Sequence, residues 1–145
     1  MSAPRAPLYT PEILALAVSL ADRPLDPALP LAGEARSRTC GSTVKLACSA
    51  DAEGRIDRLG LQVSACAIGQ AAAALFARRA VGADRLLLAE ARSEIAAWLA
   101  GAAGVPAWAE IELLAPARAH SARHCAVLLA WDAALDALSK HGAPG

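Results

Sequence analysis

The spacing at which hydrophobic residues recur along this chain changes twice. These two changes constrain the fold more than any other feature of the sequence. Apolar residues recur at helical spacing over 13–21, alternate with polar or small residues over 44–63, and return to helical spacing from residue 66 onward. A period of two is typical of strands with one buried face. The order helix, strands, helices predicts an α+β domain in which helices cover one face of an antiparallel sheet.

The expected elements follow from these patterns and from the residues beside them. The first helix should begin at Thr10 and Pro11, a capping residue followed by proline, and should end at a proline-punctuated loop over 23–32. The stripe expected to face the core is Ile13, Leu14, Ala17, Val18 and Ala21. Three antiparallel strands are expected over 34–39, 44–49 and 59–63, with a turn at 51–54. Helices are expected over 66–81, 84–100 and 122–140, with irregular connections over 101–116.

Composition excludes several classes of protein. The 145 residues are 56% hydrophobic and 19% charged, which rules out a disordered or fibrous chain, and we expect one compact domain over residues 1–145. Fourteen basic residues balance fourteen acidic ones, so neither nucleic acid nor a membrane is expected as a partner. The uncharged stretch 59–77 changes period halfway and is interpreted as a strand running into a helix. No export signal stands out, so we expect a cytoplasmic protein with reduced cysteines.

Three of the four cysteines lie where elements are expected to begin or end. Cys40 lies in a turn before Gly41, and Cys66 opens the second helix. Cys125 lies in the first turn of the last helix, for which Ser121 is the expected N-cap. The helix dipole favours a thiolate at a helix start. We therefore interpret these three cysteines as reactive or metal-binding.

Other residues favour structural interpretations. Cys48 alternates in phase with Val44 and Leu46, and it is expected to be a buried core residue. Trp131 falls on a helical stripe with Val127 and is expected in the core as well. No C-x-x-C pair indicates a zinc ribbon, and no Ser/His/Asp set or phosphate loop supports hydrolase or nucleotide chemistry.

Three local strings carry a more specific indication. They are T-C-G-S at 39–42, C-A-I-G-Q-A at 66–71 and R-H-C-A-V-L at 123–128. With these strings and this element order, the chain resembles the IscU/SufU/NifU N-terminal family of iron–sulfur cluster assembly scaffolds over most of its length. Family members have C-G-D after the first strand, G-C-x-I or C-A-I at the second helix, and H-C or K-C at the last. The resemblance implies a SufE/NifU-like α+β fold with a leading helix, a three-stranded antiparallel sheet and helices on one face.

The resemblance also implies a function. The chain would be a non-enzymatic scaffold that builds a [2Fe–2S] cluster with sulfur from a cysteine desulfurase and transfers it to apo iron–sulfur proteins. By matching positions, the cluster and metal ligands would be Cys40, Cys66 and Cys125, and we expect His124 as the fourth. Thiolates are the usual ligands of such clusters, and a histidine tunes their potential. Cys125 is the expected persulfide acceptor, because Arg123 and the helix end favour its thiolate.

The chain departs from the family pattern at three places. Ser42 replaces the family aspartate, which leaves an oxygen and removes a carboxylate. An acidic fourth group is not required, because Arg38 or Arg123 can offset the charge left by three thiolates around a positive cluster core. Ala65 replaces a glycine. The stretch 116–120 stands where some members carry the Leu-Pro-Pro-Val-Lys string that binds a dedicated Hsp70 chaperone, so we expect no such chaperone.

Two other functions remain open from the sequence. As in SufU-like members, the same site could hold zinc and accept persulfide, so that the chain stimulates a cysteine desulfurase. Alternatively, the changes at Ser42 and Ala65 could mark a metal-free interaction module with a decayed site, although three retained cysteines argue against decay. If metal does bind, we expect it to order the chain near Cys40 and Cys66, because ligands from separate element ends must converge.

Overall fold

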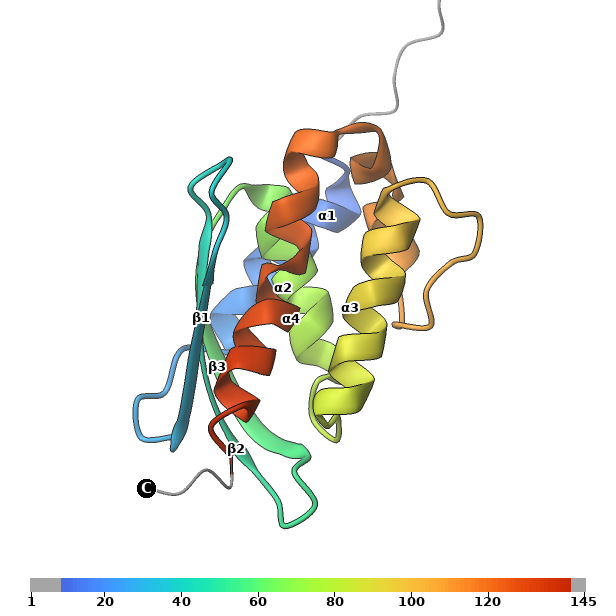
Figure 1. The fold of residues 1–145 in the computed structure, drawn as a ribbon. Helices are drawn as coiled ribbons and strands as arrows, with labels where there is room; N and C mark the ends of the chain where they lie inside the picture. Colours follow the sequence, from blue (N-terminus) through green and yellow to red (C-terminus); the bar gives the residue numbers. More distant parts are fainter. Residues whose placement is uncertain (1–8, 142–145) are drawn as a thin grey trace, which may run out of the picture.

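The computed structural model describes residues 9–141 as helices packed on one face of a sheet (Figure 1). The strands form one antiparallel sheet in the order β1-β2-β3, and α4 and α2 contact it. Helix α1 lies beside α2, and α3 packs against α4. The expected α+β architecture is confirmed. The elements are α1 (Pro11–Ser19), η1 (Leu20–Asp22), β1 (Leu31–Arg36), β2 (Thr43–Ala50), β3 (Ile56–Ser64), α2 (Ala67–Arg79), α3 (Arg85–Leu99), η2 (Ile111–Ala119), η3 (Ser121–Arg123) and α4 (His124–Leu138).

Helix α1 begins as predicted but buries a different stripe. The Thr10 hydroxyl accepts a hydrogen bond from the Ile13 N–H at 3.1 Å, which caps the helix. Ile13 and Leu16 are buried, whereas Leu14 is 48% and Val18 is 77% exposed. The predicted stripe was therefore right at Ile13, which is buried, and in part at Ala17, which is half-buried, but wrong at Leu14, Val18 and Ala21, which are exposed. Nearly every α1 residue is apolar, so periodicity alone could not select the face that packs against α2.

Strand β1 lies three residues earlier than its predicted start at residue 34. Leu31 pairs with Cys48 of β2, and the pairing continues to Arg36 opposite Thr43. The chain then turns after Ser37. The Ser37 N–H donates to the Ser42 carbonyl at 2.8 Å, which closes a tight loop. Pairing with β2 thus sets where β1 begins and ends. The alternation of apolar and polar residues within 31–39 did not reveal these ends.

The later helices begin and end within two residues of their predicted bounds. Two local features differ from expectation. Residues 111–119 form the 3-10 helix η2, where an irregular connection was expected up to residue 116. Ser121 is not the N-cap of α4, because it lies in η3; the residue before α4 is Arg123, which makes no side-chain capping bond.

The core between sheet and helices contains an aromatic cluster. Phe76 and Trp108 stack with ring centroids 5.8 Å apart, and Trp131 meets both rings edge-on. Trp131 and Cys48 are both 0% exposed, so both predictions of core positions are confirmed. The uncharged stretch 59–77 runs from β3 into α2, as predicted. None of the helices described within residues 9–141 has the length and apolarity needed to cross a bilayer.

Candidate functional site

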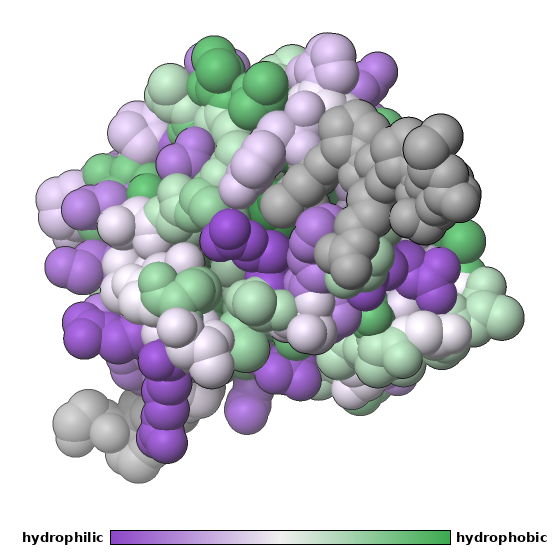
Figure 2. All heavy atoms as spheres, turned by 90° about the horizontal axis from the view of Figure 1, so that it is seen from above, coloured by the Kyte–Doolittle hydropathy of each residue, from purple (hydrophilic) through white to green (hydrophobic). Residues whose placement is uncertain are grey.

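The three element ends that carry Cys40, Cys66 and Cys125 lie at one end of the molecule (Figure 1). Thr43 pairs with Ser64, so the β1–β2 turn and the end of β3 lie at the same end of the sheet. Cys66 follows β3 directly as the N-cap residue of α2. Seen from above, this end shows hydrophobic and hydrophilic residues intermixed (Figure 2).

Helices α2 and α4 approach each other closely at their first turns. A Cβ atom added at Gly69 would lie 2.7 Å from the Ala65 Cβ and 3.3 Å from the Ala126 Cβ. Only a glycine fits this spacing without displacing a neighbour. Because Ala65 precedes Cys66 and Ala126 follows Cys125, this contact brings the backbone segments of the two cysteines together.

The start of α4 also lies toward the turn that holds Cys40. Near its other end, α4 contacts β1 through Asp136, which accepts a hydrogen bond from the Glu34 N–H at 3.0 Å. The helix therefore runs antiparallel to β1, and its first residues lie beyond the end of that strand. In agreement, the Arg123 guanidinium contributes to lowering the pKa of Cys40, although it is the smallest of the causes.

The Cys40 sulfur is exposed and lies between two buried hydroxyl groups. Its Sγ is 3.2 Å from the Ser37 Oγ and 3.0 Å from the Ser42 Oγ, and these serines are 4% and 5% exposed. The hydrogen bond with Ser37, and then that with Ser42, lowers the pKa of the Cys40 thiol. Gly41 has φ +70°, the left-handed conformation that closes this turn. Ser42 thus contacts the sulfur with a hydroxyl where the family has a carboxylate.

Cys66 is half-buried, and its backbone is held in place while its sulfur makes no capping bond. The Cys66 carbonyl accepts from the Gln70 N–H at 3.0 Å. The Gln70 side-chain amide donates to the Ala65 carbonyl at 2.9 Å. The residue is therefore oriented by its backbone, which leaves the sulfur available to a ligand.

The His124 ring is fixed by the end of η2. Its Nε2 lies 3.0 Å from the Ala117 carbonyl oxygen and 3.2 Å from that of Arg118. Carbonyl oxygens only accept, so the contacts favour the tautomer of the neutral ring in which Nε2 carries the proton and Nδ1 has a free lone pair. A histidine that donates one ring N–H to a carbonyl and offers the other nitrogen has the arrangement typical of metal ligands.

Known structures share this fold. A nitrogen-fixing NifU-like protein (N-terminal) from Brucella abortus superposes with a TM-score of 0.81 at 29% identity, over 92% of this chain and 93% of its own. A putative iron–sulfur cluster assembly scaffold protein for the SUF system from Fervidobacterium islandicum AW-1 gives 0.79 at 18% identity, over 90% and 96%. The resemblance to the IscU/SufU/NifU family is confirmed. No protein-family model and no curated protein sequence matches the chain.

The expected ligands of this chain share one end of the molecule but are not arranged around a common point. Within residues 9–141, no three His, Cys, Asp or Glu side chains are close enough to hold a metal ion. The donor set still suits a soft metal, because it combines exposed Cys40 and Cys125, half-buried Cys66 and the Nδ1 of His124. Binding by all four would require the Cys40 turn and the two helix starts to close.

The fourth cysteine of this chain is excluded from this chemistry. Cys48 lies on β2 within the core, and burial raises the pKa of its thiol to about 11. Sequence reasoning missed Ser37 and Gly69, both of which shape the site. A signal for Ser37 was available, because serine at the first position of a turn often bonds to residues two or three places later. No signal pointed to Gly69, whose role depends on α4.

Proposed function

We propose that this chain is a non-enzymatic iron–sulfur cluster assembly scaffold. The observation that carries the proposal is that Cys40, Cys66 and Cys125 come from three separate element ends at the same end of a NifU-like fold. The cargo would be a [2Fe–2S] cluster held by these thiolates with His124 as the fourth ligand. The named relatives support the proposal, since the Fervidobacterium protein is described as a putative scaffold of this kind.

The open arrangement of the ligands suits cargo that must leave again. A metal held permanently needs a preformed closed site, whereas a scaffold must release what it has assembled. The turn at residues 38–41, which carries Cys40, can move without disturbing the core, because all four of its residues are exposed. Recipients would be apo iron–sulfur proteins that offer a complete set of ligands in exchange.

Sulfur would enter by thiol–persulfide exchange with a cysteine desulfurase. A thiolate of this chain attacks the outer sulfur of the desulfurase persulfide, the sulfur–sulfur bond breaks, and the desulfurase thiolate leaves. Cys125 is the proposed acceptor, because it is exposed in the first turn of α4. Cys40 is the competing nucleophile, because its exposed thiol has a lowered pKa. Peptide mass spectrometry after a single turnover distinguishes them by which cysteine carries one added sulfur.

A second function uses the same residues for zinc and persulfide. The exposure of Cys125 and Cys40 favours it, because a persulfide acceptor needs an accessible thiolate while the remaining donors hold zinc. The chain would then stimulate a cysteine desulfurase and pass the sulfur on without building a cluster.

Anaerobic reconstitution with ferrous iron, cysteine, a desulfurase and a thiol reductant, which reduces the persulfide sulfur to sulfide, tests the two functions. We expect visible charge-transfer bands, with iron and sulfide near parity, in the wild type and in Cys48→Ala, but not in Cys66→Ala. Cys48 is the matched control, because it is the cysteine in the core. Bands that persist in Cys66→Ala would contradict the scaffold. Tightly held zinc without bands, together with Cys125-dependent desulfurase stimulation, would establish the second function.

A further inference from the structure

Strand β1 is an edge strand, and no other strand pairs with the backbone groups on its outer side. The Ser37 N–H points toward β2, where it donates to the Ser42 carbonyl, so by alternation Leu31, Gly33 and Ala35 also point their backbone groups to β2. Those of the even-numbered residues point outward. Edge strands of this kind pair readily with another chain unless they are covered.

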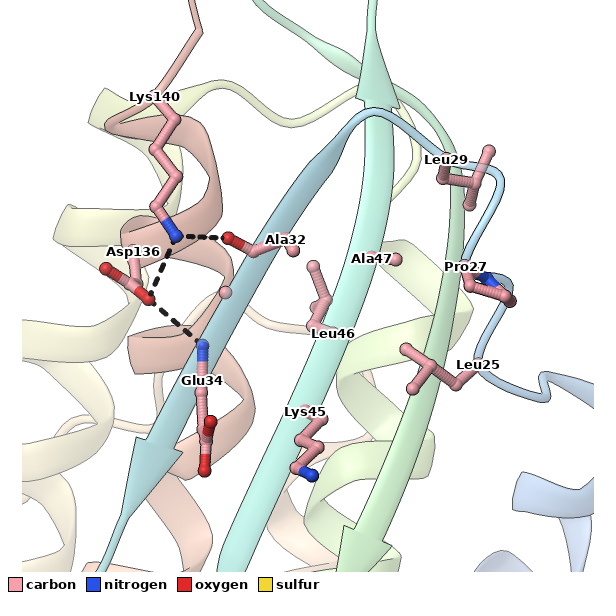
Figure 3. Close-up of a pocket in the computed structure, with 11 residues that line it drawn as sticks. Leu25, Pro27, Leu29, Ala32, Glu34, Lys45, Leu46, Ala47, Asp136 and Lys140 are labelled. Atoms are coloured by element: carbon pink, nitrogen blue, oxygen red, sulfur yellow. Dashed lines mark hydrogen bonds and ion pairs between the residues drawn. The ribbon is translucent and has the colours of Figure 1, made fainter.

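Two side chains of the last helical segment cover this edge, and we call them the edge clasp (Asp136 and Lys140). The Asp136 Oδ2 accepts from the Glu34 N–H at 3.0 Å, and the Lys140 Nζ donates to the Ala32 carbonyl at 2.6 Å. The same Asp136 oxygen lies 3.8 Å from the Lys140 ammonium. Figure 3 shows the three interactions side by side along β1. The clasp therefore presents to β1 one acceptor and one donor, as a neighbouring strand would.

The other edge of the sheet is covered by backbone. The Leu61 N–H of β3 donates to the Arg23 carbonyl at 3.0 Å, and Pro24 forms a bridge with Leu61. This loop is held by the chain on both sides, so it cannot easily leave the β3 edge. In contrast, the clasp consists of two flexible side chains that are 46% and 55% exposed, so β1 is the edge that can open.

The uncovered edge of β1 would be complementary to itself. Glu34 and Arg36 are exposed and lie on the sheet face opposite α4. Suppose that two copies of β1 pair antiparallel with Glu34 of each copy opposite Arg36 of the other. The outward N–H and C=O groups of the two strands would then hydrogen-bond to each other, and two pairs of opposite charge would form. Opposite charges placed directly across two strands stabilise their pairing.

We propose that β1 is a docking edge for a second copy of this chain and that the edge clasp keeps it closed. The partner copy would add its own β1 antiparallel, with Glu34 of each copy facing Arg36 of the other. The proposal is independent of the metal ligands, because the clasp lies near the opposite end of α4.

Sedimentation velocity across a concentration series tests this directly. The variant Asp136→Ala with Lys140→Ala should shift from the wild-type species toward twice its mass as concentration rises. Asp132→Ala is the matched control, because it removes an ion pair of the same helix, with Arg92 at 2.7 Å, that does not touch β1. Circular dichroism checks that each variant is folded. If the double variant shows a reduced helical signal, the single variant Lys140→Met takes its place.

Charge reversal then tests the pairing itself. In the clasp-free background, Glu34→Arg should return the protein to the wild-type mass, because like charges would face each other. Adding Arg36→Glu should restore the dimer. A clasp-free protein that sediments like the wild type at every concentration overturns the proposal. A dimer that persists in the Glu34→Arg variant also overturns the proposal, because another surface would then hold the two copies together.

Discussion

At the residue scale, Cys40 and Cys48 show how one residue type acquires opposite properties from its surroundings. Two buried hydroxyls bind the exposed Cys40 sulfur and lower the pKa of its thiol. The core around Cys48 raises the pKa of its thiol to about 11, because burial disfavours the charged thiolate. Nucleophilic reactivity belongs to the thiolate, so the two cysteines should react at very different pH.

We predict that Ser37→Ala and Ser42→Ala each raise the pKa of Cys40. Each substitution removes a hydrogen bond that favours the thiolate, so the pKa rises and a smaller fraction of Cys40 is thiolate at a given pH. Alkylation of metal-free protein by iodoacetamide, followed at the Cys40 peptide by mass spectrometry, should show its pH midpoint moving upward.

Two internal comparisons make this measurement decisive. Ser49→Ala removes a β2 hydroxyl that bonds to Asp57 and should leave the Cys40 profile unchanged. The Cys48 peptide should stay unlabelled until denaturant is added. An unshifted Cys40 profile in both serine variants would show that the hydroxyls do not control this sulfur.

At the element scale, glycines determine how closely α4 can approach its neighbours. A Cβ at Gly33 would lie 2.0 Å from the Ala133 carbonyl oxygen, so β1 can contact α4 only without a side chain there. A Cβ at Gly69 would lie 3.3 Å from the Ala126 Cβ of α4 and 2.7 Å from the Ala65 Cβ, which lies just before α2. The contact at Gly69 lies at the start of α4, and the contact at Gly33 lies in its second half.

We predict that Gly69→Ala lowers the free energy of unfolding by about 1–3 kcal/mol, the usual cost of overpacking. Gly33→Ala should cost more, because the added atom meets rigid backbone rather than a methyl group. Urea denaturation measures both. Gly104→Ala, whose Cβ would meet nothing within 4 Å, is the matched control and should change little. Equal stability of Gly69→Ala and the wild type would show that Ala65 and Ala126 leave room for a methyl group at this position.

At the scale of the whole molecule, binding and folding should be linked through the open site. The proposed ligands come from the β1–β2 turn, the start of α2 and the start of α4. A metal that joins them stabilises the folded state only, by about 2.7 kcal/mol at a free concentration one hundred times the Kd.

We predict that zinc raises the Tm of the metal-free protein and that a chelator reverses the change. Hydrogen exchange should slow over residues 37–42 and 64–69, because the ligand-bearing backbone becomes ordered. Cys48→Ala should keep the zinc response, and Cys66→Ala should lose it. A zinc-induced Tm shift of equal size in Cys66→Ala would place the metal elsewhere.

The sequence by itself determined the order of the elements, the three antiparallel strands and the burial of Cys48 and Trp131. These depend on local periodicity, which a short stretch of chain carries within itself. The same patterns placed Cys40, Cys66 and Cys125 at element ends, and the local strings around them indicated the family.

Only the tertiary structure decided which face of α1 is buried, where β1 begins and what surrounds each cysteine. The α1 face depends on α2, and the start of β1 depends on Cys48 of its partner strand. The Nε2 bonds of His124 and the closeness of α2 and α4 at Gly69 likewise join residues far apart in the chain. Such contacts are set by packing between elements, and no local pattern of residues encodes them.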